Sequence, residues 1–346
     1  MVCSQSCAAW VWARRRPEQL KPFRQRWPWI GPDLQTLRDT LRPPLLPADH
    51  GHPLAIAVGD GASLLAMCDP PNAGEPRALV VLLHGLGGSS QREGLRRMGL
   101  SLQAAGLVVW RLNLRGAGPG RQLAAGTYAA RCDRDLLPVL RRAREQAGGL
   151  PLLGVGISLG GTMLLNAVLA QPGLLDALVC TSSPLDLARC SEQIERPRNR
   201  VYQRWLLSRL RAQTLADPFG VAGDERRALE GRNRPRTIRA FDAAITAPRW
   251  GYTSVEQYYR EASPLPRLSG QLPPTLLLHA LDDPWVPAHD AENLAAKPPP
   301  GLEVLLTARG GHNGFHGVGD DPLSCWGDQL TVDWLQQRLA LQRQGA

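Results

Sequence analysis

The pentapeptide Gly156-Ile157-Ser158-Leu159-Gly160 decides the fold. The apolar run 151–157 precedes and overlaps it, and a second apolar run, 159–170, continues from it. A serine on a sharp turn from a buried strand into a helix is typical of a nucleophile elbow. The glycines suit such a turn because they remove side chains that would collide around a strained backbone. The pattern therefore predicts that the Ser158 hydroxyl is exposed at the edge of a sheet, at the positive end of the following helix.

Strand-like and helix-like blocks alternate on both sides of this stretch, as they do in a parallel α/β sheet. Short apolar runs typical of buried strands lie at 78–83, 107–112, 151–157, 177–181, 275–280 and 302–307. Helical spacing occurs at 91–105, 129–147, 159–170 and 323–342. Residues 54–58 and 63–68 flank Gly59-Asp60-Gly61, which predicts a hairpin ahead of the repeat. The predicted fold class is α/β, with a mostly parallel central sheet flanked by helices.

Roughly ninety residues between the strands at 177–181 and 275–280 interrupt this rhythm, too many for an ordinary connection. They hold fourteen arginines between Arg189 and Arg249. We interpret residues 186–269 as a helical cap over the carboxyl edge of the sheet; a helical decoration away from the site is the alternative. The predicted core then comprises residues 51–185 and 270–346, with residues 1–50 as an N-terminal extension packing on it.

A serine nucleophile needs a base, and the base needs an orienting acid. His312 follows the last predicted strand in a glycine-rich loop, and Asp282-Asp283 follows the strand before it. Serine, then aspartate, then histidine is the chain order of α/β hydrolases. A glycine-rich turn in which Ser158 only caps the helix is the alternative. We predict a catalytic triad of Ser158, Asp283 and His312.

Two positions of this triad have rivals in the sequence. Asp283 begins Asp283-Pro284-Trp285-Val286-Pro287, a D-x-x-V-P form that favours it as the acid, and Asp282 is then expected to brace the turn. His316, four residues beyond His312, is the only other histidine near a strand end. His279 is expected to be a packed strand residue, and His289 to begin a helix.

An oxyanion hole is expected where His84-Gly85-Leu86-Gly87-Gly88 follows the first strand of the repeat. One backbone N–H of this loop should face the developing negative charge, and the residue after the nucleophile should supply the second. We therefore predict the amides of Leu86 and Leu159 as the donors. The loop does not fit a dinucleotide site, because it lacks the third glycine of G-x-G-x-x-G and Asn113-Leu114-Arg115 supplies no acid after the next strand.

Composition excludes several other classes of protein. The chain has 346 residues, of which 43% are hydrophobic and 21% charged, so it is neither disordered nor fibrous. The net charge of +9 is carried almost wholly by scattered arginines without a nucleic-acid-binding motif, so no nucleic-acid partner is expected. No paired His or Cys/His spacing predicts a metal. No cofactor is expected, and the oligomeric state is not predicted.

Seven widely spaced cysteines without a C-x-x-C motif indicate a reducing, cytoplasmic setting. No apolar run approaches the roughly 20 residues of a membrane-spanning helix. Trp10-Val11-Trp12 followed by Arg14, Arg15 and Arg16 has its basic residues on the wrong side for a signal peptide. This segment leaves open a weak peripheral membrane contact, with a packed or frayed terminus as the favoured interpretation.

Motifs across residues 22–340 resemble the α/β-hydrolase subfamily of YheT-type hydrolases and abhydrolase-domain lipases. Pro32-Asp33-Leu34-Gln35-Thr36-Leu37 resembles its N-terminal P-H-L-Q-T segment, with Asp33 where histidine is usual. Further similar stretches are Arg111 to Gly116, Gly251-Tyr252, Tyr258-Tyr259, Ser263-Pro264, Leu276 to Asp283 and Gly310 to Phe315. The resemblance implies an α/β-hydrolase fold.

The same resemblance implies a serine hydrolase that acts on carboxylic esters, including short- or medium-chain acyl esters and acylglycerols. Ser158 would be its nucleophile, His312 its general base and Asp283 the partner of the base. Some relatives make esters by acyl transfer, and a thioesterase or amidase would differ only in the leaving group. A non-catalytic binding protein on the same fold is the remaining alternative. The arginine-rich cap leaves the acyl-chain length open.

Overall fold

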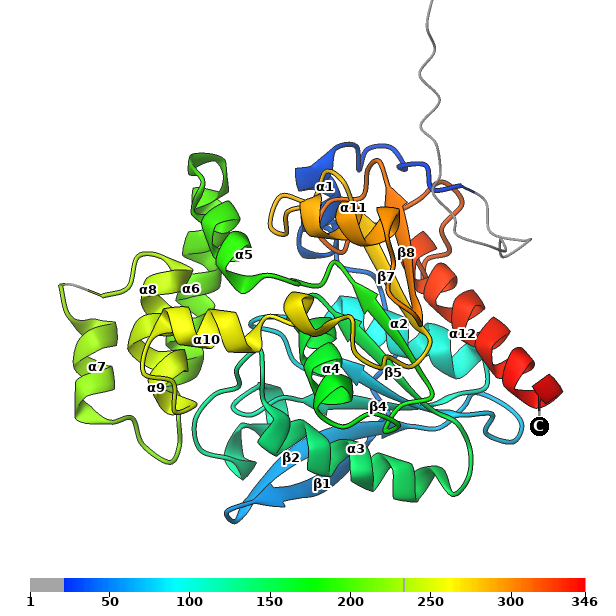
Figure 1. The fold of residues 1–346 in the computed structure, drawn as a ribbon, viewed down its shortest axis with the longest axis horizontal. Coiled ribbons are helices and arrows are strands. Elements are labelled where there is room, and N and C mark those ends of the chain that lie inside the picture. Colours follow the sequence, from blue (N-terminus) through cyan, green and yellow to red (C-terminus); the bar gives the residue numbers. More distant parts are fainter. Residues whose placement is uncertain (1–21, 233, 346) are drawn as a thin grey trace, which may run out of the picture.

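The computed structural model describes residues 22–232 and 234–345 and has an eight-stranded sheet at its centre (Figure 1). The strands are β1 (His52–Gly59), β2 (Ala62–Asp69), β3 (Leu79–Leu83), β4 (Val108–Asn113), β5 (Leu152–Ile157), β6 (Ala177–Thr181), β7 (Thr275–Ala280) and β8 (Leu302–Thr307). Their order in the sheet is β1-β2-β4-β3-β5-β6-β7-β8. The N-terminal Trp/Arg segment, Cys3 and Cys7 lie outside the described residues.

The sheet is parallel from β4 to β8, and only β2 runs in the opposite direction, antiparallel to both β1 and β4. In β3 and β6 every residue is buried, because helices cover both faces of the parallel part. The predicted mostly parallel α/β sheet is therefore confirmed. Parallel strands end at one edge of a sheet, so the loops after β3, β5, β7 and β8 meet there.

Helices cover the two faces of the sheet and build a core on each. On one face, α2 (Glu93–Ala104) and α12 (Trp326–Gly345) pack Leu102 and Trp334 against alternate residues of β3, β4 and β5. On the other face, α3 (Asp133–Ala147) and α4 (Leu159–Ala170) bury Leu140 and Leu164 against the remaining alternate residues. The α4 helix is apolar nearly all round and almost wholly buried, so it is held firmly behind the residue that precedes it.

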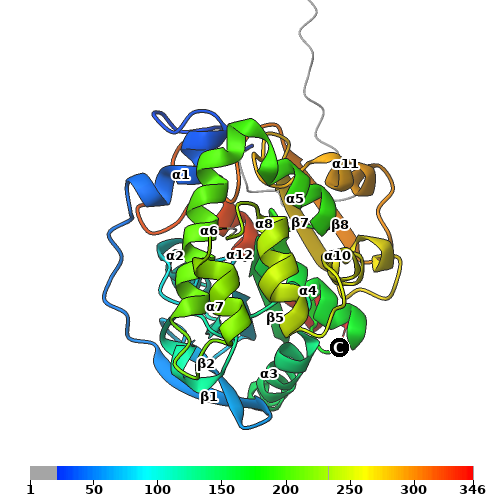
Figure 2. The same cartoon turned by 90° about the vertical axis from the view of Figure 1, so that its left-hand side faces the viewer.

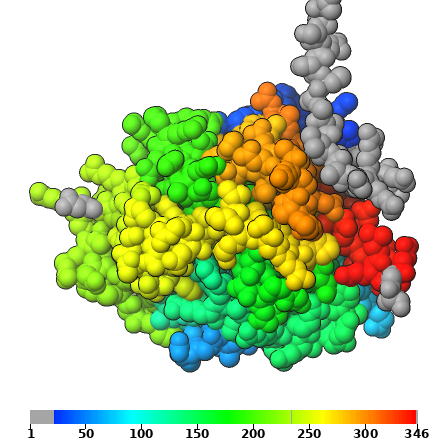
Figure 3. Space-filling model, viewed as in Figure 1, coloured from blue at the N-terminus to red at the C-terminus, as the bar shows by residue number. Residues whose placement is uncertain are grey.

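Between β6 and β7 the chain forms a group of helices, here named the α5–α10 segment. Its elements are α5 (Leu187–Glu195), η2 (Pro197–Asn199), α6 (Arg200–Leu215), α7 (Gly223–Glu230), α8 (Ile238–Phe241), a π-helix η3 (Asp242–Thr246), α9 (Ala247–Arg249) and α10 (Val255–Ala262). The segment lies at one end of the sheet in Figure 1 and in front of it in Figure 2. The space-filling view shows it as a lobe in contact with the rest of the molecule (Figure 3).

Helix α1 (Pro32–Leu41) packs against the loop that follows β8. Gln35 Nε2 donates to His316 O at 3.0 Å, and Gln35 Oε1 accepts from His316 N at 2.8 Å. Phe23, ahead of α1, packs on the rings of Phe315 and Trp326. The remaining short elements are α11 (His289–Ala296), η1 (Gly118–Leu123) and η4 (Leu265–Arg267).

Two helices begin three or more residues later than their periodicity predicts. Helix α3 begins at Asp133 rather than at 129, because the backbone of Ala130 is bonded to side chains of other elements: its N–H donates to Tyr258 Oη and its carbonyl accepts from Asn166 Nδ2. Helix α12 begins at Trp326 rather than at 323, because Asp321 holds a turn there. In the described part of the chain, no helix is long and apolar enough to cross a membrane.

Candidate active site

Ser158 lies on the turn between β5 and α4 in a strained backbone conformation, with φ 54° and ψ −125°. Two glycines make this turn sterically possible. A Cβ atom on Gly156 would overlap the backbone of Gly161, and one on Gly160 would lie 2.7 Å from the carbonyl oxygen of Leu83. Since real side chains cannot approach backbone so closely, the packing of α4 against β3 and β5 requires glycine at both positions.

Three side chains from three loops form one hydrogen-bonded chain. His312 Nε2 lies 2.9 Å from Ser158 Oγ, and His312 Nδ1 lies 2.8 Å from Asp283 Oδ2. All three residues are buried. The structure therefore brings together the three residues that the sequence singles out, in the order nucleophile, base and acid that acyl transfer requires.

Asp283 is held as an ionised carboxylate. Burial raises the pKa of its carboxyl, but the electrostatic interaction with His312 and the hydrogen bond from that imidazole lower the pKa more, so the net shift is downward. Its other oxygen, Oδ1, accepts from the backbone N–H groups of Trp285 and Val286 at 2.8 and 3.0 Å. Both oxygens are therefore committed, one to the histidine and one to the loop.

The two rival residues occupy different environments. Asp282 Oδ1 accepts from Gly311 N at 2.8 Å and so ties the β7 loop to the histidine loop. His316 faces Asp39 and Asp320 rather than Ser158, with Nε2 at 3.4 Å from Asp39 Oδ1. Burial lowers the pKa of His316 to about 3, so this imidazole is neutral at pH 7.

Two residues that contact His312 were not predicted from the sequence. The Trp285 ring stacks on the imidazole, with the ring centroids 4.4 Å apart. Thr36 of α1 accepts from His312 N through Oγ1 at 2.8 Å, although it is 276 residues away in the chain. Trp285 is part of the D-x-x-V-P stretch and Thr36 of the Pro32–Leu37 stretch, so both motifs mark the right segments without indicating these contacts.

The loop after β3 approaches Ser158 closely. A Cβ atom on Gly85 would lie 3.0 Å from Ser158 Cβ. Gly87 N donates to Tyr128 Oη at 2.6 Å, which holds the next turn of the loop in place. The N–H groups of Leu86 and Leu159 have no acceptor within residues 22–232 and 234–345, and both residues line the pocket with Ser158. This arrangement leaves two donors available to an oxyanion.

His84 braces the same loop as a neutral imidazole. Burial lowers its pKa to about 4. Leu114 N donates to His84 Nε2 at 3.3 Å, so the proton lies on Nδ1, which donates to Gly85 O at 2.8 Å. This histidine thus positions the loop, and both of its ring nitrogens are bonded to backbone groups rather than to Ser158.

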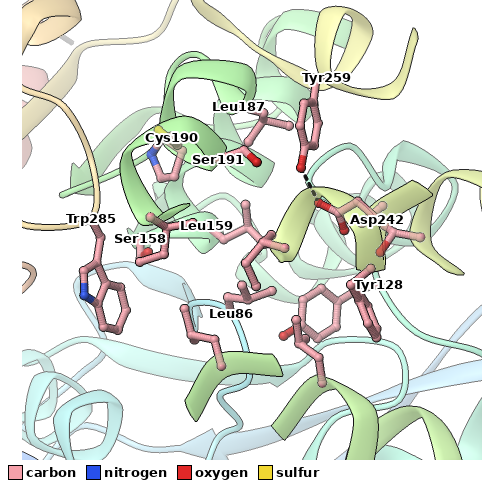
Figure 4. Close-up of a pocket in the computed structure, with 18 of the residues that line it drawn as sticks. Leu86, Tyr128, Ser158, Leu159, Leu187, Cys190, Ser191, Asp242, Tyr259 and Trp285 are labelled. Atoms are coloured by element: carbon pink, nitrogen blue, oxygen red, sulfur yellow. Dashed lines mark hydrogen bonds between the residues drawn. The ribbon is translucent and has the colours of Figure 1, made fainter. Parts of the chain in front are cut away.

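An apolar pocket of about 120 Å³ opens beside Ser158 and His312 (Figure 4). Its walls come from the loop after β3, the start of α4 and the α5–α10 segment, chiefly Leu86, Leu159, Leu187, Ile194, Leu206, Leu210, Ile238 and Phe241. A pocket lined in this way suits a hydrocarbon chain. The arginines of the segment contribute none of its lining residues.

A single carboxylate, Asp242 of the π-helix, interrupts this apolar lining. Asp242 Oδ2 accepts from Tyr259 Oη at 2.8 Å, as the dashed line in Figure 4 shows. Burial raises the pKa of Asp242 to about 6, although hydrogen bonds from Thr246 and Tyr259 lower it. The ionised carboxylate therefore destabilises the fold at neutral pH.

Asp242→Asn should change the pH dependence of stability. Between pH 4 and about 6 the native state holds a proton that the unfolded state releases, so wild-type stability falls as pH rises through this range. The shift from 3.8 to about 6 corresponds to roughly 3 kcal/mol. Relative to wild type, Asp242→Asn is expected to gain up to that amount between pH 4 and 7. Urea unfolding at pH 4, 5, 6 and 7 measures it; a difference that stays constant with pH would contradict the expectation.

No group of three or more His, Cys, Asp or Glu side chains that could hold a metal ion occurs among the residues that the structure describes.

Comparison with known proteins places this site in a family. The sequence model of the alpha/beta hydrolase fold family matches residues 78–317, and the chain belongs to that family. Within it, the chain belongs to the subfamily of YheT and the abhydrolase-domain proteins. It is 33% identical to YheT of Escherichia coli (strain K12) over 274 residues, covering 78% of this chain and 80% of the relative.

Two further proteins are similar to this chain. Phospholipase ABHD3 of Mus musculus is 28% identical, covering 88% of this chain and 72% of the relative. The solved structure of a soluble variant of monoglyceride lipase from Saccharomyces cerevisiae has a TM-score of 0.53 at 18% identity, covering 83% of this chain and 96% of that one. The structural likeness shows the fold, and the sequence matches support a hydrolase of the esterase and lipase type.

Proposed function

We propose that this protein is a serine hydrolase that cleaves carboxylic esters through an acyl-enzyme on Ser158. The observation that carries the proposal is the continuous hydrogen-bonded chain from Ser158 through His312 to Asp283 at the mouth of an apolar pocket. A binding protein on the same fold would have no need of all three residues in this arrangement. The substrates are short- to medium-chain acyl esters or acylglycerols.

In the first step, His312 Nε2 takes the proton of Ser158 Oγ as that oxygen attacks the ester carbonyl carbon. Asp283 stabilises the imidazolium that forms, because its carboxylate already holds Nδ1–H. The carbonyl electron pair moves onto oxygen, where the N–H groups of Leu86 and Leu159 would receive it. Each such donor typically contributes about 3 kcal/mol to transition-state stabilisation.

The tetrahedral intermediate then collapses. The electron pair returns to re-form the carbonyl, the bond to the leaving alcohol breaks, and His312 gives its proton to the departing oxygen. Water repeats the sequence against the acyl-enzyme: His312 removes its proton, the acid is released and Ser158 Oγ regains its hydrogen. The acyl chain is expected to lie in the apolar pocket during both steps, since that pocket is lined mainly by leucine, isoleucine and phenylalanine.

The proposal is tested by reacting the purified protein with a fluorophosphonate probe and with p-nitrophenyl esters from acetate to decanoate. We expect labelling, and a rate that rises with chain length until the pocket is filled. Adding ethanol or glycerol separates hydrolysis from acyl transfer by the products formed, and a matched thioester series identifies a thioesterase. Correctly folded protein that neither labels nor turns over any ester would overturn the proposal.

We further propose a cytoplasmic setting. The five cysteines within the described residues, Cys68, Cys132, Cys180, Cys190 and Cys325, are all free thiols. Free thiols of this number are usual in reducing compartments.

A further inference from the structure

Two aromatic rings connect the α5–α10 segment to His312. The Trp285 ring lies on the His312 imidazole with the two ring planes 28° apart, and the Tyr202 ring of α6 packs on the Trp285 ring at 5.3 Å and 68°. An edge-to-face contact at this separation is a favoured arrangement of two aromatic rings. Trp285 lies on the same side of the apolar pocket as Ser158 in Figure 4. The two rings therefore reach from α6 to the proposed general base.

A ring on one face of the imidazole supplies a restraint that the hydrogen bonds of His312 do not. These bonds hold Nδ1 to Asp283 and Nε2 to Ser158. The imidazole can still tilt about the line that joins its two nitrogens, and such a tilt turns both bonds out of line. Hydrogen bonds weaken steeply as their angle narrows. Because Trp285 covers one face of the imidazole, it opposes this tilt.

The α5–α10 segment also holds the loop that carries Trp285. Pro284 lies between Asp283 and Trp285, and its carbonyl oxygen accepts from Asn199 Nδ2 at 2.7 Å and from Gln193 Nε2 at 3.3 Å. Asn199 is wholly buried, so breaking its hydrogen bonds would leave polar groups without partners. The segment thus fixes both the backbone of this loop and the ring that the loop carries.

Tyr202 is itself anchored to α1, which lies beside α6 in Figure 2. Its Oη donates to Asp33 Oδ1 at 2.8 Å, and Asp33 Oδ2 pairs with Arg198 at 3.0 Å. Burial and the hydrogen bond to Asp33 raise the pKa of Tyr202, so its hydroxyl stays protonated and able to donate. The same helix reaches His312 a second time, since Thr36 Oγ1 accepts from His312 N.

We propose that Trp285 and Tyr202 are positioning residues for His312: the Trp285 ring fixes the plane of the imidazole, and Tyr202 holds the Trp285 ring in place. This inference rests on the proposed function, because it concerns how the base of that reaction is held. The α5–α10 segment then supports the reaction through the base as well as through the pocket. A catalytic group misplaced by about 1 Å can cost about a hundredfold in rate.

Substitutions at both rings test the restraint with p-nitrophenyl butyrate. Trp285→Leu and Tyr202→Leu should each lower kcat at least about tenfold and leave KM within about twofold, because the base is misplaced while the acyl pocket remains. Trp285→Phe and Tyr202→Phe keep a ring at each position and should recover most of the loss. Both side chains also line a second cavity of about 680 Å³ beside Ser158. A raised KM with unchanged kcat would therefore identify them as substrate contacts and overturn the inference.

Tyr252→Leu is the matched control for the tyrosine variant. The Tyr252 ring packs on that of Tyr258 at 5.2 Å, a contact of similar length in the same segment, but Tyr252 lines neither cavity beside Ser158. This variant should leave kcat unchanged. A loss of kcat equal to that in Tyr202→Leu would mean that any loosening of the segment slows the reaction, and the specific role of Tyr202 would be refuted.

A double variant shows whether Tyr202 acts through Trp285. Adding Tyr202→Leu to Trp285→Leu should lower kcat by less than about twofold more, since the ring through which Tyr202 acts is already gone. Two losses that multiply would show independent effects and would contradict the proposal.

A spectroscopic signal that needs no turnover separates this inference from the proposed function. The Nδ1–H proton of His312, which Asp283 accepts, gives a proton NMR resonance at low field that broadens as the proton exchanges with water. We expect a sharp resonance in the wild type and in Tyr252→Leu, and a broadened one in Trp285→Leu and Tyr202→Leu. Equal sharpness in all four proteins would overturn the inference whether or not esters are hydrolysed. The expected broadening in a protein that hydrolyses no ester would overturn the esterase proposal alone.

Discussion

Ser158→Ala is expected to abolish labelling by a fluorophosphonate and to lower kcat/KM for a p-nitrophenyl ester by at least about 10³-fold. Without Oγ no acyl-enzyme can form. Only the N–H donors of the proposed oxyanion hole and the binding pocket then remain to assist direct attack by water on the ester. Steady-state kinetics with butyrate and octanoate esters, alongside gel detection of the probe, measure both effects. Alanine keeps the Cβ atom and the same backbone constraints at φ 54°, so the elbow itself should be preserved.

Ser191 offers a control within the same pocket. It lines the pocket from α5 and is buried, yet no hydrogen bond joins it to His312. Ser191→Ala should therefore keep the label and lose less than about tenfold in rate. Unchanged unfolding temperatures in both variants would exclude a loss of fold. A probe that still reacts with Ser158→Ala at the wild-type rate would place the nucleophile elsewhere.

The elbow is the part of the site that local sequence describes best. The elbow lies within a stretch of twenty residues that holds its glycines, its apolar strand and its apolar helix. The sequence of this stretch is therefore enough to predict the tight turn. The positions of Asp283 and His312 follow from a second local rule, because loops after parallel strands gather at one edge. The predicted and observed bounds of β3, β6 and β7 differ by at most one residue, because each of these strands is a continuous buried run.

Contacts between distant segments are not visible in this way. Thr36 meets His312 across 276 residues, and Trp205 of α6 meets Arg92, the residue directly before α2. Asp242 lies in a π-helix that no apolar period indicates, and its partner Tyr259 belongs to α10. Arginine content predicts a charged cap, but only the packing shows that the lining of the apolar pocket excludes the arginines of the α5–α10 segment.

Asp283→Asn is expected to lower kcat by about 10³- to 10⁴-fold at pH 7 with the fold intact. Asp283 Oδ1 accepts two backbone N–H groups, from Trp285 and Val286, so an asparagine must keep its carbonyl oxygen there. Its NH₂ group would then face His312 Nδ1 and donate to it. The imidazole proton would be displaced to Nε2, which could no longer accept the proton of Ser158 Oγ at 2.9 Å.

Asp282→Asn separates the two neighbouring carboxylates and decides which one is the acid. Asp282 Oδ1 accepts from Gly311 N, and an asparagine carbonyl can accept the same hydrogen bond. The histidine loop should therefore keep its place, and the rate should fall by less than about tenfold, as expected for a neutral hydrogen bond retained in similar geometry. Kinetics of both variants with one p-nitrophenyl ester make the comparison. A larger loss of rate in Asp282→Asn than in Asp283→Asn would identify Asp282 as the acid of the triad, because only the carboxylate that orients His312 can set the tautomer of its imidazole.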